Sequence, residues 1–408
     1  MPEIDGARLL RDLRHLAEFG RYKSGVHRPT FSPQDVESRQ WLVGCLREAG
    51  LAAEIDGIGN IMSTSPASGP KLLIGSHLES QSHAGWLDGA MGVIFGLEVA
   101  RAFREDPTCR DLGIEVAVFA DEEGHFGSFL GSRSFIGELS DEDVAKAANR
   151  ATGQPLTEAL AQAGFGGRPR YVLEPDRHVG FIEAHIEQGD TLESTGRRVG
   201  VVTSIVGIWT YEIVFEGQQN HAGTTRMAAR KDAGFALTEL CHAISKRFPE
   251  VAGERSVWTT GRIRLEPGAP SIIPGRADMY FQFRDAEPER LQAMERALEE
   301  LVEASDKAGP CRASLRALSR SVPNVMALPI QAALEEAAER HAPGSALRMP
   351  SGAGHDAQYL ARRLPAGMVF VPSIGGISHH WTEDTADADL VLGCQVLATA
   401  AETLLRAA

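Results

Sequence analysis

Short apolar segments alternate with helix-like segments over the first half of the chain, and this alternation constrains the fold more than any other feature. Residues 71–77 and 114–123 are predicted to be strands, and residues 89–105 between them form a helical pattern. Residues 179–188 are predicted to be a further strand that leads into a helix. Strands that alternate with helices favour an α/β fold, in which helices flank a mostly parallel sheet.

The pattern changes near residue 208. Antiparallel strands are predicted at 208–217, 257–267 and 276–285, and long helices at 227–248 and 288–309. After residue 321 the α/β pattern resumes, with a helix at 331–341, a strand at 367–373 and a closing helix at 390–407.

A chain of 408 residues exceeds the usual size of a single hydrophobic core, so two domains are expected. The predicted catalytic domain comprises residues 1–207 and 322–408. The predicted insert, a smaller α+β unit, comprises residues 208–321.

Charge and cysteine usage restrict the partners and the compartment. The formal net charge is −14, which argues against nucleic acid or an anionic membrane as a partner, because both are bound through excess Lys and Arg. Five scattered cysteines without a CxxC pair fit a reducing compartment. The first 20 residues form an amphipathic helix unlike a signal peptide, and no apolar run is expected to span a membrane. A cytoplasmic location is therefore predicted.

Polar residues of the metal-ligand type follow the predicted strands or lie in glycine-rich loops. The set consists of His77, Asp88, Glu122, Glu123, His185 and His379. Each alone has an ordinary explanation, as a core histidine or a solvated acid. Together they converge on the carboxyl ends of strands, where open α/β sheets carry their sites. Imidazole and carboxylate groups without thiols suit zinc, manganese or cobalt.

The adjacent pair Glu122–Glu123 has a chemical use at such a site. One carboxylate can bind a metal ion while the other faces a water molecule bound to that ion. A bound cation lowers the pKa of this water to about 7, and a nearby carboxylate then takes its proton at neutral pH.

Motifs in the same order along nearly the whole chain give it a resemblance to a known family. The motifs are FSPQD, GSHLES, LDGAMGV, ADEEGHFGSFLGSRSF, EAHIEQG, NHAGTTRM, IIPGRADMYFQFR, SGAGHDA and VPSIGGISHHWTE. With these the chain resembles the amidase/hydantoinase/carbamoylase family, which includes N-carbamoyl-L-amino-acid hydrolases and allantoate amidohydrolases. The resemblance implies a zinc-aminopeptidase-like sheet with an inserted lid or dimerisation domain, and a homodimer.

The resemblance also implies roles for individual residues. Two divalent ions (Zn, Mn or Co) would be held by His77, Asp88, Glu123, His185 and His379. Asp88 would bridge them, Glu123 and His379 would share one ion, and His77 and His185 would hold the other or exchange places. Glu122 would be the general base, and His221 the group that stabilises the oxyanion. Substrate contacts are expected from Gln188, Ser271, Arg284, Gly354 and His355.

Three positions depart from the family pattern. The family's His-x-Asp is His77-x-Glu79 here, so the acid expected to orient His77 is longer by one methylene. Ser271 replaces the usual Asn, and Arg226 replaces the Pro of HAGTTP. These changes affect groups around the substrate and leave the hydrolytic residues intact.

The predicted function is metal-dependent hydrolysis of a linear C–N amide bond in a small carboxylate-bearing molecule, with the ureido group of an N-carbamoyl-L-amino acid or of allantoate as the leading candidate. One alternative is an N-acyl-amino-acid or dipeptide hydrolase that uses the same site. Another is a metal-binding protein without turnover.

Overall fold

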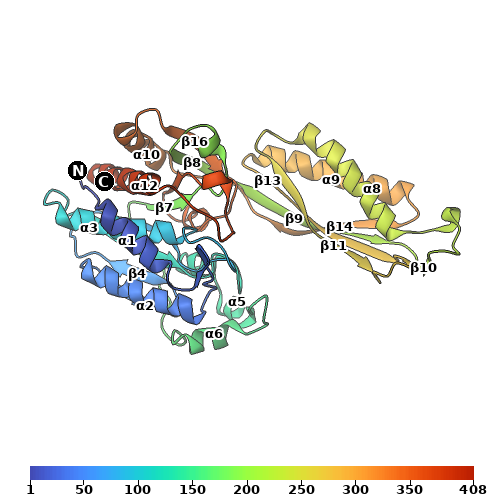
Figure 1. Ribbon diagram of the computed structural model, residues 1–408, viewed down its shortest axis with the longest axis horizontal. Helices are drawn as coiled ribbons and strands as arrows, with labels where there is room; N and C mark the ends of the chain where they lie inside the picture. The colour runs from blue at the N-terminus through green and yellow to red at the C-terminus, as the bar shows by residue number, and fades with distance from the viewer. The chain divides into compact units, whose positions relative to one another are not determined.

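The computed structural model describes residues 1–408, and the chain divides into two compact units (Figure 1). Unit 1 comprises Met1–Thr203 and Val325–Ala408, and unit 2 comprises Ser204–Asn324. These boundaries lie within four residues of the predicted ones, 207/208 and 321/322.

A nine-stranded sheet forms the centre of unit 1, in the order β15-β8-β17-β7-β5-β6-β4-β3, with β16 paired to β8. The neighbours β17, β7, β5 and β6 are parallel, and antiparallel strands flank them on both sides. The predicted α/β class with a mostly parallel central sheet is confirmed. The strands are β3 (Ala52–Ile55), β4 (Ile61–Thr64), β5 (Lys71–His77), β6 (Gly113–Phe119), β7 (Phe181–Ile186), β8 (Val199–Ile205), β15 (Asn324–Val325), β16 (Ala346–Ser351) and β17 (Ala366–Val371).

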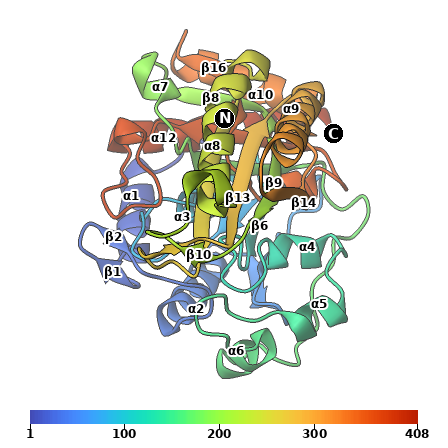
Figure 2. The ribbon, with the colours of Figure 1, turned by 90° about the vertical axis from the view of Figure 1, so that its right-hand side faces the viewer.

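Helices cover this sheet, and α3 packs on β5, β6 and β7 while α12 packs on α3, α10 and β17 (Figures 1 and 2). The helices are α1 (Gly6–Leu16), α2 (Pro33–Glu48), α3 (Ala90–Glu105), α4 (Leu130–Phe135), α5 (Asp141–Lys146), α6 (Leu156–Gln162), α7 (Thr191–Ser194), α10 (Leu328–His341), α11 (Ala357–Leu360) and α12 (Asp387–Ala407). A short hairpin, β1 (Arg21–Tyr22) with β2 (Gly25–Val26), and a 3₁₀ turn, η2 (Ile374–Gly376), complete the unit.

Local sequence explains where these helices begin and end. The Ser32 side chain accepts a hydrogen bond from the backbone N–H of Asp35 and caps α2, and Gly50 follows the helix with a φ of 82°. The helix predicted after β7 is reduced to the four residues of α7, because Gln188 has a φ of 59° and interrupts the helical path.

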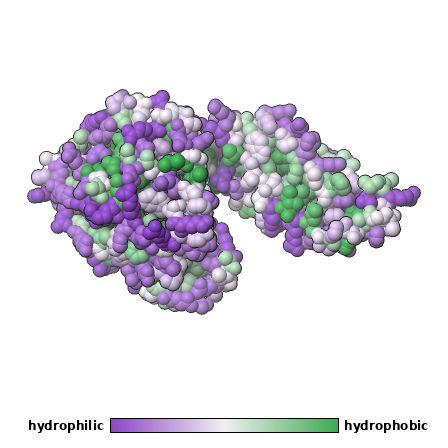
Figure 3. Space-filling model, viewed as in Figure 1, coloured by the Kyte–Doolittle hydropathy of each residue, from purple (hydrophilic) through white to green (hydrophobic).

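Helix α12 corrects one expectation. It is long and apolar enough to cross a membrane by length and composition, although no such run was expected from the sequence. Its apolar residues have another explanation, since Leu390, Cys394, Val396 and Leu397 are fully buried in the core of unit 1. Figure 3 shows mainly hydrophilic residues on the visible surface of unit 1, and a mixture of hydrophilic and hydrophobic residues on that of unit 2.

Unit 2 is a four-stranded antiparallel sheet, in the order β11-β13-β9-β14, with two long helices packed on it. Its apolar core joins the helices to β9 and β13 and includes Phe215, Leu240 and Phe281. The elements are β9 (Gly207–Glu216), β10 (Asn220–His221), the 3₁₀ turn η1 (Met227–Ala229), α8 (Ala233–Val251), β11 (Val257–Glu266), β12 (Ile272–Ile273), β13 (Arg276–Asp285), α9 (Pro288–Ala308) and β14 (Arg312–Arg320).

Two features of unit 2 differ from the prediction. The helix expected from residue 227 begins at Ala233, because the Asp232 side chain accepts hydrogen bonds from the N–H groups of Gly234 and Phe235. Strand β14 was not predicted, since it is an exposed edge strand rich in arginine and lacks a clear apolar alternation.

The chain passes between the units through two paired segments. In unit 1 the N–H of Met326 donates to the carbonyl of Thr203 at 2.9 Å. In unit 2 the N–H of Ser321 donates to the carbonyl of Ile208 at 3.1 Å. The outgoing and returning chains are therefore neighbours at both ends of the connection.

Candidate active site

Three adjacent parallel strands bring most of the candidate ligands to one edge of the unit 1 sheet. Strand β5 ends at His77, and its neighbour β7 carries His185 as its last but one residue. Strand β6, on the other side of β5, ends at Phe119, and Glu122 and Glu123 follow three and four residues later. Parallel strands place their carboxyl ends together, so residues more than 100 positions apart in the sequence become neighbours.

Asp88 is the centre of the cluster, and its two carboxylate oxygens face different sets of side chains. Oδ1 lies 3.1 Å from Nε2 of His185 and 3.6 Å from Nε2 of His77. Oδ2 lies 3.2 Å from Nε2 of His379, which is itself 3.8 Å from Oε2 of Glu123. Two groups with metal-ligand geometry result, His77–Asp88–His185 and Asp88–Glu123–His379.

Backbone carbonyls fix the two buried imidazoles. Nδ1 of His77 lies 3.0 Å from the carbonyl oxygen of Glu79, and Nδ1 of His185 lies 2.9 Å from that of Ile186. Each ring is thereby held with Nε2 towards Asp88, the arrangement expected for histidine ligands. The expectation that the Glu79 carboxylate orients His77 is wrong, because the contact comes from the Glu79 main chain.

The acids of the cluster have perturbed pKa values. Burial raises the pKa of Glu122 well above its usual range, and burial together with nearby Asp88 raises that of Glu123 to about 7. For Asp88 burial acts in the same direction, but hydrogen bonds from His185, His379 and His77 outweigh it and hold its pKa well below the usual range. The hydrogen bond to Asp88 raises the pKa of His379 to about 9.

Glu122 differs from the ligand candidates in its position. Its Oε2 lies 3.7 Å from Nε2 of His77, yet Glu122 belongs to neither ligand group. Its side chain is only 9 % exposed. A carboxylate beside the ligands but outside them, with a raised pKa, is suited to accept and return a proton.

Two of the expected substrate residues also lie at this cluster. Nε2 of Gln188 donates to Oδ2 of Asp88 at 3.0 Å, and its Oε1 is buried without a partner. The ring of His355 packs edge-on against that of His185 with centroids 4.6 Å apart, and its Nδ1 is also buried without a partner. Gly354 precedes His355 in the same loop, where an added Cβ would lie 3.1 Å from the Phe129 ring.

The remaining expected residues belong to unit 2. His221 and Ser271 are brought together, since His221 in β10 pairs with Ile272 of β12 and the N–H of Ala222 donates to the Ser271 carbonyl at 3.0 Å. Arg284 lies near the far end of β13, opposite Ile208, so it is not close to His221. The eight residue-to-residue steps of extended strand from Arg276 to Arg284 span roughly 26 Å.

Glu383, which was not predicted from the sequence, also lies beside Asp88. Its Oε1 accepts the N–H of Asp88 at 3.1 Å and its Oε2 accepts the Ser378 hydroxyl at 2.9 Å. Burial and the charge of Asp88 raise its pKa to about 8. Glu383 lies four residues after His379, so an acid in the same loop was the available signal.

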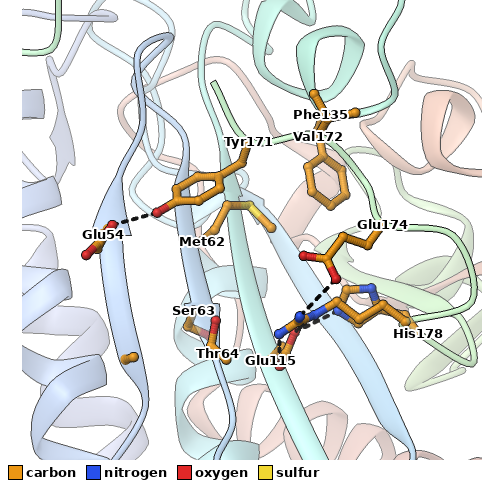
Figure 4. A pocket seen from close by; sticks show the side chains of 12 residues that line it. Glu54, Met62, Ser63, Thr64, Glu115, Phe135, Tyr171, Val172, Glu174 and His178 are labelled. Carbon is orange, nitrogen blue, oxygen red and sulfur yellow. Dashed lines mark hydrogen bonds and ion pairs between the residues drawn. The ribbon is translucent and has the colours of Figure 1, made fainter. Parts of the chain in front are cut away.

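A separate cavity of about 290 Å³ opens beside β4 and β6 (Figure 4). Glu115 lies buried at its edge, with Oε2 accepting from Nε of Arg177 at 3.0 Å and lying 2.8 Å from Nε2 of His178. On the opposite side, the Tyr171 hydroxyl donates to Glu54 at 2.6 Å. None of the candidate site residues lines this cavity.

The fold and the shared carboxylate together define a class of proteins, in which an α/β sheet holds two adjoining ligand groups at the carboxyl ends of its strands. Within this class, the sequence model of "Peptidase family M20/M25/M40" matches residues 75–403. The chain belongs to this family.

Relatives and solved structures agree. The chain is 33% identical over 405 residues to an N-carbamoyl-L-amino acid amidohydrolase of Geobacillus stearothermophilus, covering 97% of each chain. It is 33% identical over 389 residues to an allantoate amidohydrolase of Bacillus subtilis, covering 94% of this chain and 93% of the relative. A Burkholderia phymatum amidase of the hydantoinase/carbamoylase family superposes with a TM-score of 0.92 at 48% identity, over 100% of this chain and 99% of the other. The resemblance noted in the sequence is confirmed.

Proposed function

We propose that this protein is a metal-dependent amidohydrolase that cleaves the ureido group of an N-carbamoyl-L-amino acid or of a related ureido acid such as allantoate. The observation that carries the proposal is the shared carboxylate of Asp88, whose two oxygens face His185 and His379 at 3.1 and 3.2 Å. A carboxylate that joins two ligand groups is typical of hydrolases with two metal ions.

The donor set fits two divalent cations. Each group offers imidazole nitrogen and carboxylate oxygen and no thiol, which suits zinc, manganese or cobalt. The negative charge of Asp88 and Glu123 favours cations there. His77 and His185 would complete one ion's ligands, and Glu123 and His379 those of the other, with Asp88 common to both.

Two bound divalent ions would polarise the scissile carbonyl and lower the pKa of a water molecule at the site. Glu122 takes the proton of the attacking water and returns it to the nitrogen that leaves as the C–N bond breaks. Gln188 and His355 have unpartnered polar atoms beside the ligands, at Oε1 and Nδ1, and these atoms are available to the substrate.

Residues of unit 2 complete the proposed mechanism. His221 stabilises the oxyanion, and the guanidinium of Arg284 binds the substrate carboxylate through two hydrogen bonds. Roughly 26 Å of β13 separates these two regions of unit 2. We also propose that the protein is a homodimer, as the family resemblance implies.

The named relatives support the substrate class, since two of them are an N-carbamoyl-L-amino acid amidohydrolase and an allantoate amidohydrolase. The test is to strip the protein of metal, add back manganese, zinc or cobalt, and measure ammonia release from N-carbamoyl-L-amino acids and allantoate. N-acyl-amino acids and dipeptides are followed in parallel by chromatography. Ammonia release supports the proposal. Cleavage of acyl or peptide substrates alone would instead indicate an N-acyl-amino-acid or dipeptide hydrolase. Absence of turnover with every substrate would indicate a metal-binding protein without catalytic activity.

A further inference from the structure

Alternate residues after strand β5 serve different parts of the candidate site. His77 ends the strand and faces Asp88. Two residues on, Oε1 of Glu79 accepts the backbone N–H of Glu122 at 2.7 Å. Two residues further, Nε2 of Gln81 donates to Oε2 of Glu123 at 2.8 Å. One short segment therefore reaches a candidate ligand, the proposed base and a second candidate ligand.

The carboxylate of Glu79 is held rigidly from its other side. Its Oε2 accepts Nη2 of Arg39 at 2.7 Å, and Nε of Arg39 lies 3.0 Å from both oxygens of Asp35. Nη1 of Arg39 donates to the carbonyl of Gly59 at 2.8 Å. All three charged side chains are completely buried. A buried carboxylate that accepts from both a guanidinium and a backbone N–H has little freedom to move.

The turn that carries Glu122 needs such support. Asp121, directly before it, is a non-glycine residue with a φ of 61°, a conformation that is retained only when the surroundings hold it. Its carboxylate accepts the N–H of Gly127 at 2.7 Å and the hydroxyl of Thr30 at 3.0 Å. Glu79 accepts the backbone N–H of Glu122. The turn is therefore held at two points, the Asp121 side chain and the Glu122 backbone amide.

We infer that the Glu79 carboxylate, braced by Arg39, is a positioning group for Glu122 and does not serve His77. This inference rests on the proposed function, since it gives Glu79 its role through the proposed base. The extra methylene of Glu79 relative to the aspartate usual in the family lets its carboxylate lie between Arg39 and the Glu122 N–H.

The substitution Glu79→Gln tests this role because of a difference in hydrogen-bonding capacity. A carboxylate accepts from both donors, whereas an amide can accept from only one and turns an N–H towards the other. The expected result is a kcat lower by about 10- to 100-fold with little change in KM, as found for groups that orient active-site residues. The affinity for manganese, titrated into metal-stripped protein, is expected to stay unchanged.

Hydrogen exchange gives a readout that needs no turnover. In E79Q the one amide oxygen should face the charged Arg39, so the backbone amide of Glu122 loses its acceptor and the peptide that contains Glu122 should exchange faster by mass spectrometry. Gln81→Leu is the matched control, because it removes the contact to Glu123 two residues further along. It is expected to weaken manganese binding and to leave the exchange of the Glu122 amide unchanged.

Folding is checked by thermal melting, and Glu79→Asp replaces E79Q if the latter does not fold. Asp keeps the charge beside Arg39 but shortens the reach to Glu122, so the same pattern is expected in a milder form. Weaker manganese binding in a folded Glu79 variant, with normal hydrogen exchange at the Glu122 amide, would overturn the inference. Glu79 would then be a residue that orients His77. A wild-type protein without turnover refutes the proposed function instead, and the manganese titration and the exchange measurement still decide what Glu79 holds.

Discussion

Replacing Glu122 with Gln should separate turnover from metal binding. The general base of a hydrolase contributes about 10²- to 10⁴-fold to the rate, so kcat should fall by this factor. At 1.36 kcal/mol for each factor of ten, this loss corresponds to roughly 2.7–5.4 kcal/mol of transition-state stabilisation. The Gln side chain has the same shape as Glu, so the loss reflects the missing base and not a cavity.

The structure explains why E122Q should keep its metal ions and its fold. Glu122 lies outside both ligand groups, and its contact with His77 is 3.7 Å long. Burial raises the pKa of Glu122 well above the usual range, and nearby Glu123 adds to this effect, so the charged form is costly in the folded protein. A neutral Gln removes that cost. The variant should therefore be at least as stable as the wild type before metal is added.

The assay pairs E122Q with Glu123→Gln, the same change in the adjacent residue. Both variants are loaded with manganese, dialysed and analysed for metal content, and kcat is measured by ammonia release. E122Q should retain the wild-type metal content, whereas E123Q should lose metal, because Glu123 belongs to the group with Asp88 and His379. Turnover of E122Q at the wild-type rate, or loss of metal from E122Q while E123Q keeps it, would contradict the role of Glu122 as the base.

Three further outcomes follow from the geometry. Gly89→Ala should abolish metal binding in a calorimetric titration, because its Cβ would lie 2.3 Å from the His77 ring and Gly89 has a φ of 65°. Glu115, whose pKa is lowered to about 2, should contribute at most about 3 kcal/mol to stability. This contribution is present above pH 4.5 and is lost as the pH falls towards 2, so Glu115→Gln should destabilise at pH 7 and matter less near pH 4 in urea unfolding. Metal binding at pH 7 should release protons, because Asp88 raises the pKa of His379 to about 9, and calorimetry in buffers of different ionisation enthalpy counts them.

The part of the site carried by regular strands could be predicted from sequence. Strands β5 and β7 are apolar runs that carry His77 and His185 at their ends, and parallel pairing brings such ends together whatever their separation in the chain. The acids Glu122 and Glu123 follow the same rule after β6. The pattern of apolar residues identifies each strand. The direction of the strand then places the residue at its carboxyl end on one edge of the sheet.

The rest of the candidate site depends on which atoms form hydrogen bonds with one another, and the pattern of apolar residues does not contain that information. The partner of His77 is the main-chain oxygen of Glu79, which any residue type supplies, so the side chain at that position gave a misleading signal. Glu383 acts through the N–H of Asp88, almost 300 residues away in sequence. Strand β14 was missed because an exposed edge strand needs no apolar side and leaves no alternation to detect.

The two paired segments through which the chain passes between the units have a consequence for the evolution and the folding of the protein. Because Thr203 and Met326 are hydrogen-bonded neighbours, unit 2 occupies the place that a tight turn could fill. Loop-closure entropy grows only with the logarithm of length, so extending a turn of a few residues to roughly 120 costs about 3 kcal/mol. Pairing of Ile208 with Ser321 shortens the effective loop further once unit 2 has folded. Each unit can thus acquire mutations without a change in the chain path of the other. Either unit can also be expressed alone, with the two chain ends at the connection joined by a short linker.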